Sequence, residues 1–384
     1  MKLNRLLKYA VFLVGMSAFI QVYSVQAVLP LLMAELHAGE VQAGLAVGAT
    51  VLGVALMSPF MGMLSDAFGR KWLIVGSVLY LALPTALLAL APNIEILTLF
   101  RLLQGLAVPG ITVVLIAYIG EEFKKHEVVQ LMTLYVSGTV FGGFSGRFML
   151  GHLTEWLGWR SAFLVMAALS AACAVFVWKQ LPKSQNFVAK PHIQTALATL
   201  KSHLHNRVVL AAGALGGCVL FSLVGCFTYI NLHLAQPPYA LGSSALANIF
   251  TVYLIGMVIT PLSAKLIRSF GSRITIFIAV GLSMAGVLLA YAQPLWLIVV
   301  GLTMMSSGVF ITQAATINYI AEHVKEGRSL ASGLYYMAYY SGGTIGAWLC
   351  GLAYAAGQWT AVICVLLSVQ TAALLIAKKG MQAV

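Results

Sequence analysis

Two arginines, Arg101 and Arg147, lie inside long apolar stretches of the chain, at 97–119 and 129–150. A guanidinium group stays charged and presents five N–H donors in a planar fork, which suits it to carboxylates and phosphates. A charge several residues inside an apolar helix is unfavourable in lipid, so we expect both arginines to face protein or a water-filled cavity. The alternative is that their side chains snorkel to the nearby membrane interface.

Patterns that would support covalent catalysis, nucleotide hydrolysis or metal binding are missing. No H-E-x-x-H, G-x-S-x-G or D-x-D occurs at the end of an apolar stretch, and there is no P-loop. The pair His203-x-His205 could hold a metal, but its surroundings supply no acidic or cysteine ligand, which favours a solvated interfacial helix. We therefore expect neither a metal nor a cofactor. Five cysteines lie in apolar runs without ligand spacing and are expected to be small buried hydrophobes: Cys173, Cys218, Cys226, Cys350 and Cys364.

The composition points to the membrane. Soluble domains average about 25% charged residues, whereas this chain of 384 residues is 61% apolar and only 8% charged. Since about 20 apolar residues cross a bilayer core, the chain can supply roughly twelve crossings. A net charge of +12 would suit nucleic acid only on a basic face of a soluble domain, and no segment offers one. We predict an all-α polytopic membrane protein.

The apolar runs predict twelve membrane-spanning helices. Lys2, Arg5 and Lys8 precede the first run, as in a signal peptide, but the run continues past Val22 without a small-residue cleavage site. We therefore expect a retained first span. The twelve runs cover 9–31, 42–62, 72–91, 97–119, 129–150, 159–179, 208–231, 245–264, 274–292, 295–319, 329–351 and 358–377.

The basic residues set the orientation of these spans. With the N-terminus in the cytoplasm and alternating sides, nineteen of the twenty-two Lys and Arg fall on the cytoplasmic side; the exceptions are Arg101, Arg147 and Arg160. Cytoplasmic loops of membrane proteins carry such an excess of positive charge, and the loss or gain of one span would reverse every later loop. We expect both termini to be cytoplasmic.

The chain repeats itself with a period of about 200 residues. A shift of 200 places Tyr135 on Tyr335, and a shift of 202 places Gly69 on Gly271. Matches at nearly the same offset and at equivalent topological positions indicate two structural repeats with the same orientation. The longest polar stretch divides the spans six and six. We predict an N-terminal six-helix half at 1–180, a cytoplasmic linker at 181–206 and a C-terminal six-helix half at 207–384.

The connection between the second and third spans carries a specific motif. It reads Gly-Met-Leu-Ser-Asp-Ala-Phe-Gly-Arg-Lys at 62–71 and resembles the loop signature G-x-L-x-D-r-x-G-R-K of the major facilitator superfamily. The resemblance implies that Asp66, the only aspartate, pairs with the start of the eleventh span, where Arg328 stands. The alternative is that the motif's cations only set topology. The implied gating residues are Gly62, Asp66, Gly69, Arg70, Lys71 and Arg328.

Two further segments resemble patterns of the same family. Arg101-Leu-Leu-Gln104-Gly105 resembles R-x-x-Q-G, and the fifth span is similar to the antiporter signature G-x-x-x-G-P-x-x-G-G. Gly143 stands where proline is expected and Arg147 replaces the final glycine, which weakens an inference of proton antiport. Small residues at this spacing let two helices approach closely, and we expect them between the halves. The packing glycines are Gly138, Gly142, Gly143, Gly146, Gly342, Gly343 and Gly346.

The resemblance covers the whole chain, and details such as Gly158-Trp159-Arg160 resemble the YnfM-type branch of bacterial drug-efflux-like facilitators. It implies a monomeric secondary transporter in the bacterial inner membrane, with twelve helices in two parallel six-helix repeats. Such a protein would export a small organic solute by alternating access, with a proton or a counter-ion as coupling partner. The alternatives are an uptake transporter for a small organic anion and a membrane enzyme or assembly factor without transport.

In that architecture, spans 1, 4, 7 and 10 line a central cavity, with spans 2, 5, 8 and 11 between the halves. The electropositive cavity favours anionic or neutral solutes over organic cations. No acid lies within a span, so a coupling proton needs Glu35, Glu121, Glu122, Glu155, His152 or the substrate itself. The tyrosines of the eleventh span are either substrate contacts or packing residues. The predicted substrate contacts are Gln26, Arg101, Gln104, Arg147, Asn231, Gln313, Asn318, Tyr335 and Tyr339.

Overall fold

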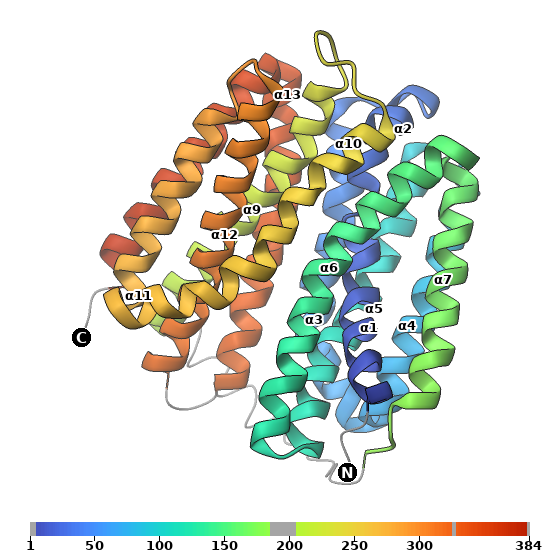
Figure 1. The fold of residues 1–384 in the computed structure, drawn as a ribbon, viewed down its shortest axis with the longest axis vertical. Helices are drawn as coiled ribbons and strands as arrows, with labels where there is room; N and C mark the ends of the chain where they lie inside the picture. Colours follow the sequence, from blue (N-terminus) through green and yellow to red (C-terminus); the bar gives the residue numbers. More distant parts are fainter. Residues whose placement is uncertain (1–4, 185–204, 325–327, 382–384) are drawn as a thin grey trace. The chain divides into compact units, whose positions relative to one another are not determined.

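The computed structural model describes all residues except 1–4, 185–204, 325–327 and 382–384. Within the described part the regular structure is entirely helical (Figure 1). Among the described residues, ten helices are long and apolar enough to cross a membrane. This agrees with the predicted all-α membrane fold, because helices satisfy every backbone hydrogen bond within one segment in lipid.

Most spans are single long helices, while the first and eighth predicted spans are broken by short 3₁₀ turns. The elements are α1 (Arg5–Val22), η1 (Ser24–Val28), α2 (Leu29–Glu35), α3 (Glu40–Phe68), α4 (Arg70–Leu88), α5 (Ile94–Glu122), α6 (Lys125–Leu157), α7 (Trp159–Gln180), α9 (Arg207–Leu234), α10 (Ser243–Ile249), η2 (Phe250–Leu254), α11 (Ile255–Leu289), α12 (Leu295–His323) and α13 (Arg328–Gly380).

Single residues with positive φ turn the chain between several spans. Gly69 (φ 85°, ψ 144°) separates α3 from α4, and Gly271 (φ 76°, ψ 163°) breaks α11 at the position expected from a shift of 202. Gly158 (φ 76°, ψ 154°) separates α6 from α7, and Gln358 (φ 53°, ψ −151°) breaks α13 at a shift of 200. The structure therefore repeats the turns as well as the residues. Because the breaks in α11 and α13 are so short, two pairs of predicted spans each appear as one long apolar stretch of the described chain, Ser243–Leu289 and Ala331–Gly380. The count of twelve stays a prediction.

The chain forms two compact units. Unit 1 contains Met1–Ala38, Ala49–Pro191 and Gly242–Phe250, and unit 2 contains Gly39–Gly48, His192–Leu241 and Thr251–Val384. The units change at Pro191–His192, inside the predicted linker, and the short segments 39–48 and 242–250 each belong to the unit of the other half of the chain. The predicted bounds of the halves and the linker stay a prediction. Most of the predicted linker, including His203, lies outside the described residues.

The glycines of α6 pack against α1 inside unit 1, where the two helices lie side by side (Figure 1). A side chain at Gly142 would collide with the carbonyl oxygen of Met16, and one at Gly146 with that of Ile20. Gly138 makes the same kind of approach one turn earlier. The expectation that this stripe lies between the halves is wrong, because its partner backbone comes from the same unit.

Unit 2 repeats this arrangement between α13 and α9. A side chain at Gly342 would collide with Gly217, and one at Gly346 would meet the Phe221 carbonyl oxygen at 2.5 Å. These partners lie 201 residues after Met16 and Ile20, so the contact is conserved between the two repeats within this chain. Gly343 is buried beside the stripe.

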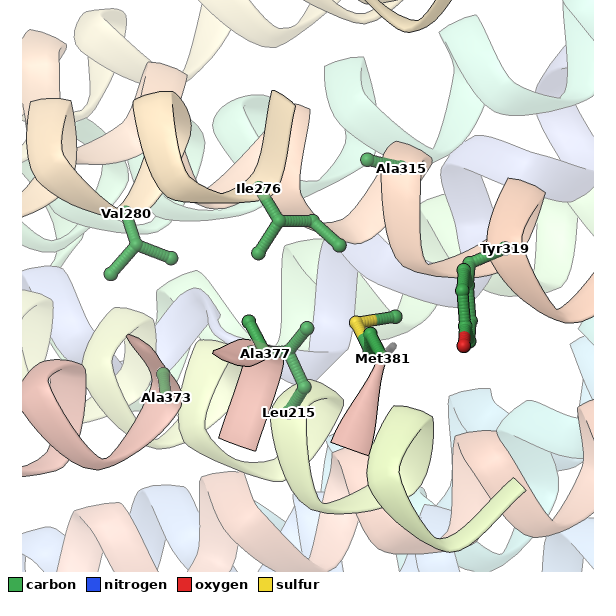
Figure 2. Close-up of a cluster of buried hydrophobic side chains, with 8 residues drawn as sticks. All are labelled: Leu215, Ile276, Val280, Ala315, Tyr319, Ala373, Ala377 and Met381. Carbon is green, nitrogen blue, oxygen red and sulfur yellow. The ribbon is translucent and has the colours of Figure 1, made fainter. Parts of the chain in front are cut away.

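An apolar cluster joins four helices of unit 2 (Figure 2). Its side chains come from α9, α11, α12 and α13 and the residue just after α13, and each is at most 4% exposed. Side chains this well covered by protein pack without lipid contact, which fixes the spacing of the helices. The members are Leu215, Ile276, Val280, Ala315, Tyr319, Ala373, Ala377 and Met381.

Candidate functional site

Arg101 of α5 holds the end of α1. Its side chain is fully buried; Nη1 donates to the carbonyl oxygen of Gln21 at 2.6 Å and to Oε1 of Gln104 at 2.7 Å, and Nη2 donates to the carbonyl oxygen of Val22. Val22 is the last residue of α1 before the chain enters the 3₁₀ turn η1. The last carbonyls of a helix lack intrahelical donors and carry partial negative charge, so a guanidinium group stabilises them.

This geometry excludes the snorkelling alternative for Arg101, because the guanidinium group bonds to buried backbone within unit 1. Gln104 extends the same network, since its Nε2 donates to Oγ1 of Thr85 on α4 at 2.7 Å. Both residues thus face protein, as expected of polar groups in a span. The hydrogen bonds of Arg101 and Gln104 therefore hold α1, α4 and α5 together, and we call this network the structural clamp.

Arg147 of α6 lies in an aromatic and amide environment. Its side chain is fully buried; Nε donates to Oε1 of Gln26 at 2.8 Å and Nη1 to the carbonyl oxygen of Gly143 at 2.6 Å. The guanidinium carbon lies 4.7 Å from the ring centroid of Tyr23 and 4.5 Å from that of Phe250. Both rings are within the range of attractive cation–π contacts, which strengthen when water is excluded.

The elements around Arg147 are irregular. Tyr23 and Gln26 stand where α1 gives way to η1, and Phe250 is the first residue of η2. Irregular backbone at membrane depth is tolerated where it is buried in protein or lines a water-filled cavity. The structure therefore brings together two predicted site residues, Gln26 and Arg147. The sequence analysis missed Phe250, which lies in an apolar run with no distinguishing neighbour.

One turn beyond Arg147, α6 contacts the short helix α10 in unit 1. Nε2 of His152 lies 3.0 Å from Oδ1 of Asn248, and a side chain at Gly151 would collide with Ala247. His152, one of the predicted proton carriers, is therefore hydrogen-bonded at the seam between α6 and α10.

Interfacial carboxylates are also engaged. Oε2 of Glu35 accepts a hydrogen bond from Nε1 of Trp159 at 2.6 Å and lies 3.5 Å from Nη1 of Arg160. The Glu35–Arg160 pair is half-exposed, so it contributes little to stability.

The motif connection holds a partly buried ion pair, in which the Glu121 side chain is 35% exposed. Arg70 is 7% exposed and binds Glu121 of α5 through two hydrogen bonds, Nη2 to Oε1 at 2.7 Å and Nε to Oε2 at 3.1 Å. Its Nη1 also donates to Oγ of Ser65. Bidentate pairs of this kind are the strong ones, so Arg70 has a structural role beyond topology. Lys71 is half-buried beside it.

The other gating residues are only partly described. The surroundings of Gly62 and the side chains of Asp66 and Arg328 are not among what the structure describes, so the expected contact between Asp66 and the start of α13 stays a prediction.

Polar residues of unit 2 occupy separate places. Asn231 of α9 is fully buried, its Nδ2 donates to the carbonyl oxygen of Phe227 at 2.8 Å and its Oδ1 has no hydrogen-bond partner. Gln313 is half-buried on α12. Asn318 donates from Nδ2 to Oγ of Ser272 at 2.9 Å and to Oε1 of Glu322 at 2.6 Å, which ties the end of α12 to α11. Contacts of these residues with substrate stay predictions.

Four tyrosines of α13 form one aromatic cluster. Tyr335, Tyr336, Tyr339 and Tyr340 have neighbouring ring centroids 5.3–6.3 Å apart. Tyr335 is fully buried, packs on Gly216 and keeps its hydroxyl without a hydrogen-bond partner. A buried hydroxyl without a partner is unfavourable, so this group is suited to bind a polar ligand atom.

Comparison with known proteins identifies the family. The family model described as Major Facilitator Superfamily matches residues 11–347 and 233–379. The chain belongs to the major facilitator superfamily. Proteins of this superfamily are multi-pass membrane transporters and not enzymes, so the alternative of a membrane enzyme is withdrawn.

Individual relatives agree with this assignment. The chain is 28% identical to the inner membrane transport protein YnfM of Escherichia coli, over 92% of this chain and 85% of that one. It is 26% identical to the chloramphenicol resistance protein CraA of Acinetobacter baumannii, over 67% of this chain and 64% of that one. The predicted resemblance to the YnfM-type branch of this superfamily is thus confirmed.

A solved structure shows the same fold. A bacterial homologue of the human lysosomal transporter Spinster, in an inward-facing and occupied conformation, superposes with a TM-score of 0.79. The match covers 97% of this chain and 96% of that chain at 16% sequence identity. The facilitator fold therefore extends over nearly the whole chain.

Proposed function

We propose that this major facilitator protein exports a small organic solute, anionic or neutral, by alternating access and as a secondary active transporter. The observation that carries the proposal is the buried guanidinium group of Arg147, held between Tyr23 and Phe250 beside Gln26. The predicted spans contain this arginine and Arg101 but no Asp or Glu.

The charge preference follows from electrostatics. Charges interact several times more strongly in a protein interior than in water, because the effective dielectric constant is lower. Spans that carry two cations several residues from their ends, Arg101 and Arg147, and no acid repel an organic cation and attract an anion. The aromatic rings around Arg147 attract its guanidinium group through their negative faces but carry no net charge, so they do not neutralise it.

Export as the direction is supported by the family branch and by the relative CraA, which is named for resistance to chloramphenicol. The proposal also includes three properties of the protein: both termini are cytoplasmic, the protein is a monomer, and transport is coupled to protons. In the proposed mechanism the halves rock about a central site. His152, placed against Asn248, is the carrier that the geometry favours for the proton, because it is a titratable group close to Arg147 along α6.

The test uses inside-out membrane vesicles and a panel of solutes that share one scaffold and differ only in charge. We expect accumulation of anionic and neutral members inside the vesicles and weaker accumulation of the cationic member. Preference for the cation would overturn the proposed substrate class. Accumulation only in right-side-out vesicles would favour the uptake alternative. Empty vesicles and the Arg147→Lys variant, which keeps the charge, serve as controls.

A further inference from the structure

A small cavity lies inside unit 2, between α9, α11, α12 and α13. About 10 Å³ of it is open to the centre of a water molecule. Polar residues on its wall are Ser222, Ser283, Thr312 and Gln370, and apolar ones include Val280 and Ala373. Val280 and Ala373 also belong to the apolar cluster of this unit (Figure 2).

The hydroxyl hydrogens of Ser222 and Thr312 are already engaged within their own helices. Oγ of Ser222 donates to the carbonyl oxygen of Cys218 at 2.9 Å, and Oγ1 of Thr312 to that of Gly308 at 2.7 Å. Nε2 of Gln370 donates to Oγ of Ser283 at 2.9 Å. A hydroxyl has one hydrogen and two lone pairs, so Ser222 and Thr312 can only accept a further hydrogen bond.

One acceptor is left without any donor. Gln370 is 3% exposed and lines the cavity, and its Oε1 has no hydrogen-bond partner. An unsatisfied buried acceptor loses its interaction with water without replacement, which is unfavourable. A donor inside the cavity would remove this penalty.

The repeat shows how the cavity arises. A shift of 201 places Gln21 on Ser222, and a shift of 200 places Ser170 on Gln370, so the two residue types are exchanged between the units. In unit 1, Nε2 of Gln21 donates directly to Oγ of Ser170 at 3.0 Å. In unit 2 the glutamine bonds instead to Ser283 of α11, and the short side chain of Ser222 leaves space at the position that Gln21 fills in unit 1.

We propose that this cavity binds a single water molecule, which donates to Oε1 of Gln370 and to the hydroxyl oxygen of Thr312 or Ser222. Its size is that of one water, and a buried water needs two to four polar partners. A neutral donor fits better than a cation, because no carboxylate lines the cavity. The water would join α13 to α12 or to α9 and so help unit 2 to move as one body.

A double-mutant cycle on the purified protein tests the bridge. Gln370→Met and Thr312→Val each remove one partner at nearly constant volume. If one water joins them, the losses in melting temperature are non-additive by at least about 2 °C. The control is Thr316→Val, because Thr316 is equally buried, also donates to a carbonyl of its own helix, and does not line the cavity. Its effect should add to that of Gln370→Met. The cycle is repeated with Ser222→Ala, because Ser222 is the other acceptor on the wall. Additive losses for Gln370→Met with both Thr312→Val and Ser222→Ala would overturn the proposal.

Cavity filling and ion exchange give two further readouts. Ala373→Val should lower the melting temperature, because it displaces the water and leaves Oε1 of Gln370 unsatisfied, whereas filling an empty apolar space would raise it. Replacement of choline chloride by sodium chloride should change the wild type and Gln370→Met equally. If sodium stabilises the wild type but not Gln370→Met, the cavity binds a cation and the assignment of a water is overturned.

Discussion

Substitution of Arg101 by methionine distinguishes between two roles of this residue, a structural contact that holds the end of α1 and a contact with substrate. Methionine keeps most of the length of the side chain but has no donors. The change leaves three buried acceptors, the carbonyl oxygens of Gln21 and Val22 and Oε1 of Gln104, without the hydrogen bonds that Arg101 supplies. The end of α1 would therefore lose its main stabilising contact with α5.

The size of the effect follows from these contacts. Hydrogen bonds to a charged group contribute about 1.5–3 kcal/mol each, so three of them give roughly 4.5–9 kcal/mol. The desolvation of a buried guanidinium group offsets several kcal/mol of this. We expect a loss of roughly 3–5 kcal/mol in the free energy of unfolding. For a unit of about 200 residues, this lowers the melting temperature by roughly 6–20 °C.

The assay is thermal unfolding of detergent-purified protein, combined with transport of the charge panel. Arg101→Lys should give an intermediate melting temperature, because one ammonium group cannot reach three acceptors as a planar fork does. Arg5→Met is the matched control, since Arg5 is exposed and its hydrogen bond to Tyr9 lies on the surface. A melting temperature of Arg101→Met within about 2 °C of wild type, together with a changed order of solutes by charge, would refute the clamp and restore Arg101 to the substrate site.

Four further outcomes are expected. Arg147→Gly should weaken binding of anionic solutes about tenfold more than that of neutral ones, measured as solute-induced thermal stabilisation; an unchanged order would make Arg147 a packing residue. Asp66→Asn should slow transport several-fold in proteoliposomes while membrane insertion is unchanged, and unaltered turnover would contradict the gate. Glu121→Gln should lower the melting temperature by several degrees, because Arg70 stays buried without its carboxylate. An unchanged melting temperature would show that the ion pair does not contribute to stability. His152→Ala should abolish the response of transport to an imposed pH gradient, and a retained response would assign the proton to another group.

Much of the fold follows from the sequence because lipid allows few solutions. The charge bias, the apolar runs and the repeat predict the helices, and Gly69 and Gly271 mark equivalent turns through their positive φ. The helix that packs against the glycine stripe of α6 could not be predicted from the sequence. A row of small residues shows that a backbone approaches, but the same row suits an interface within one unit or between two.

The site was less predictable, because its contacts join distant parts of the chain. Arg101 could be predicted to face protein, but its acceptors exist only because α1 ends at Val22, and neither Gly nor Pro stands at that residue. Glu121 lies 51 residues after Arg70, and nothing local selects it over Glu122 as the partner. The cation–π contact with Phe250 depends on the irregular backbone of η2, which an apolar run does not reveal.

The assignment of Gly242–Phe250 to unit 1 has a consequence for biosynthesis. A ribosome that has released the first six spans into the membrane has not yet made the ring that covers one face of Arg147. Until residue 250 is synthesised, Tyr23 and Gln26 must accommodate that guanidinium group without it. The first unit is therefore finished only after the second repeat has begun to insert, so the order of translation and the order of folding differ for this protein.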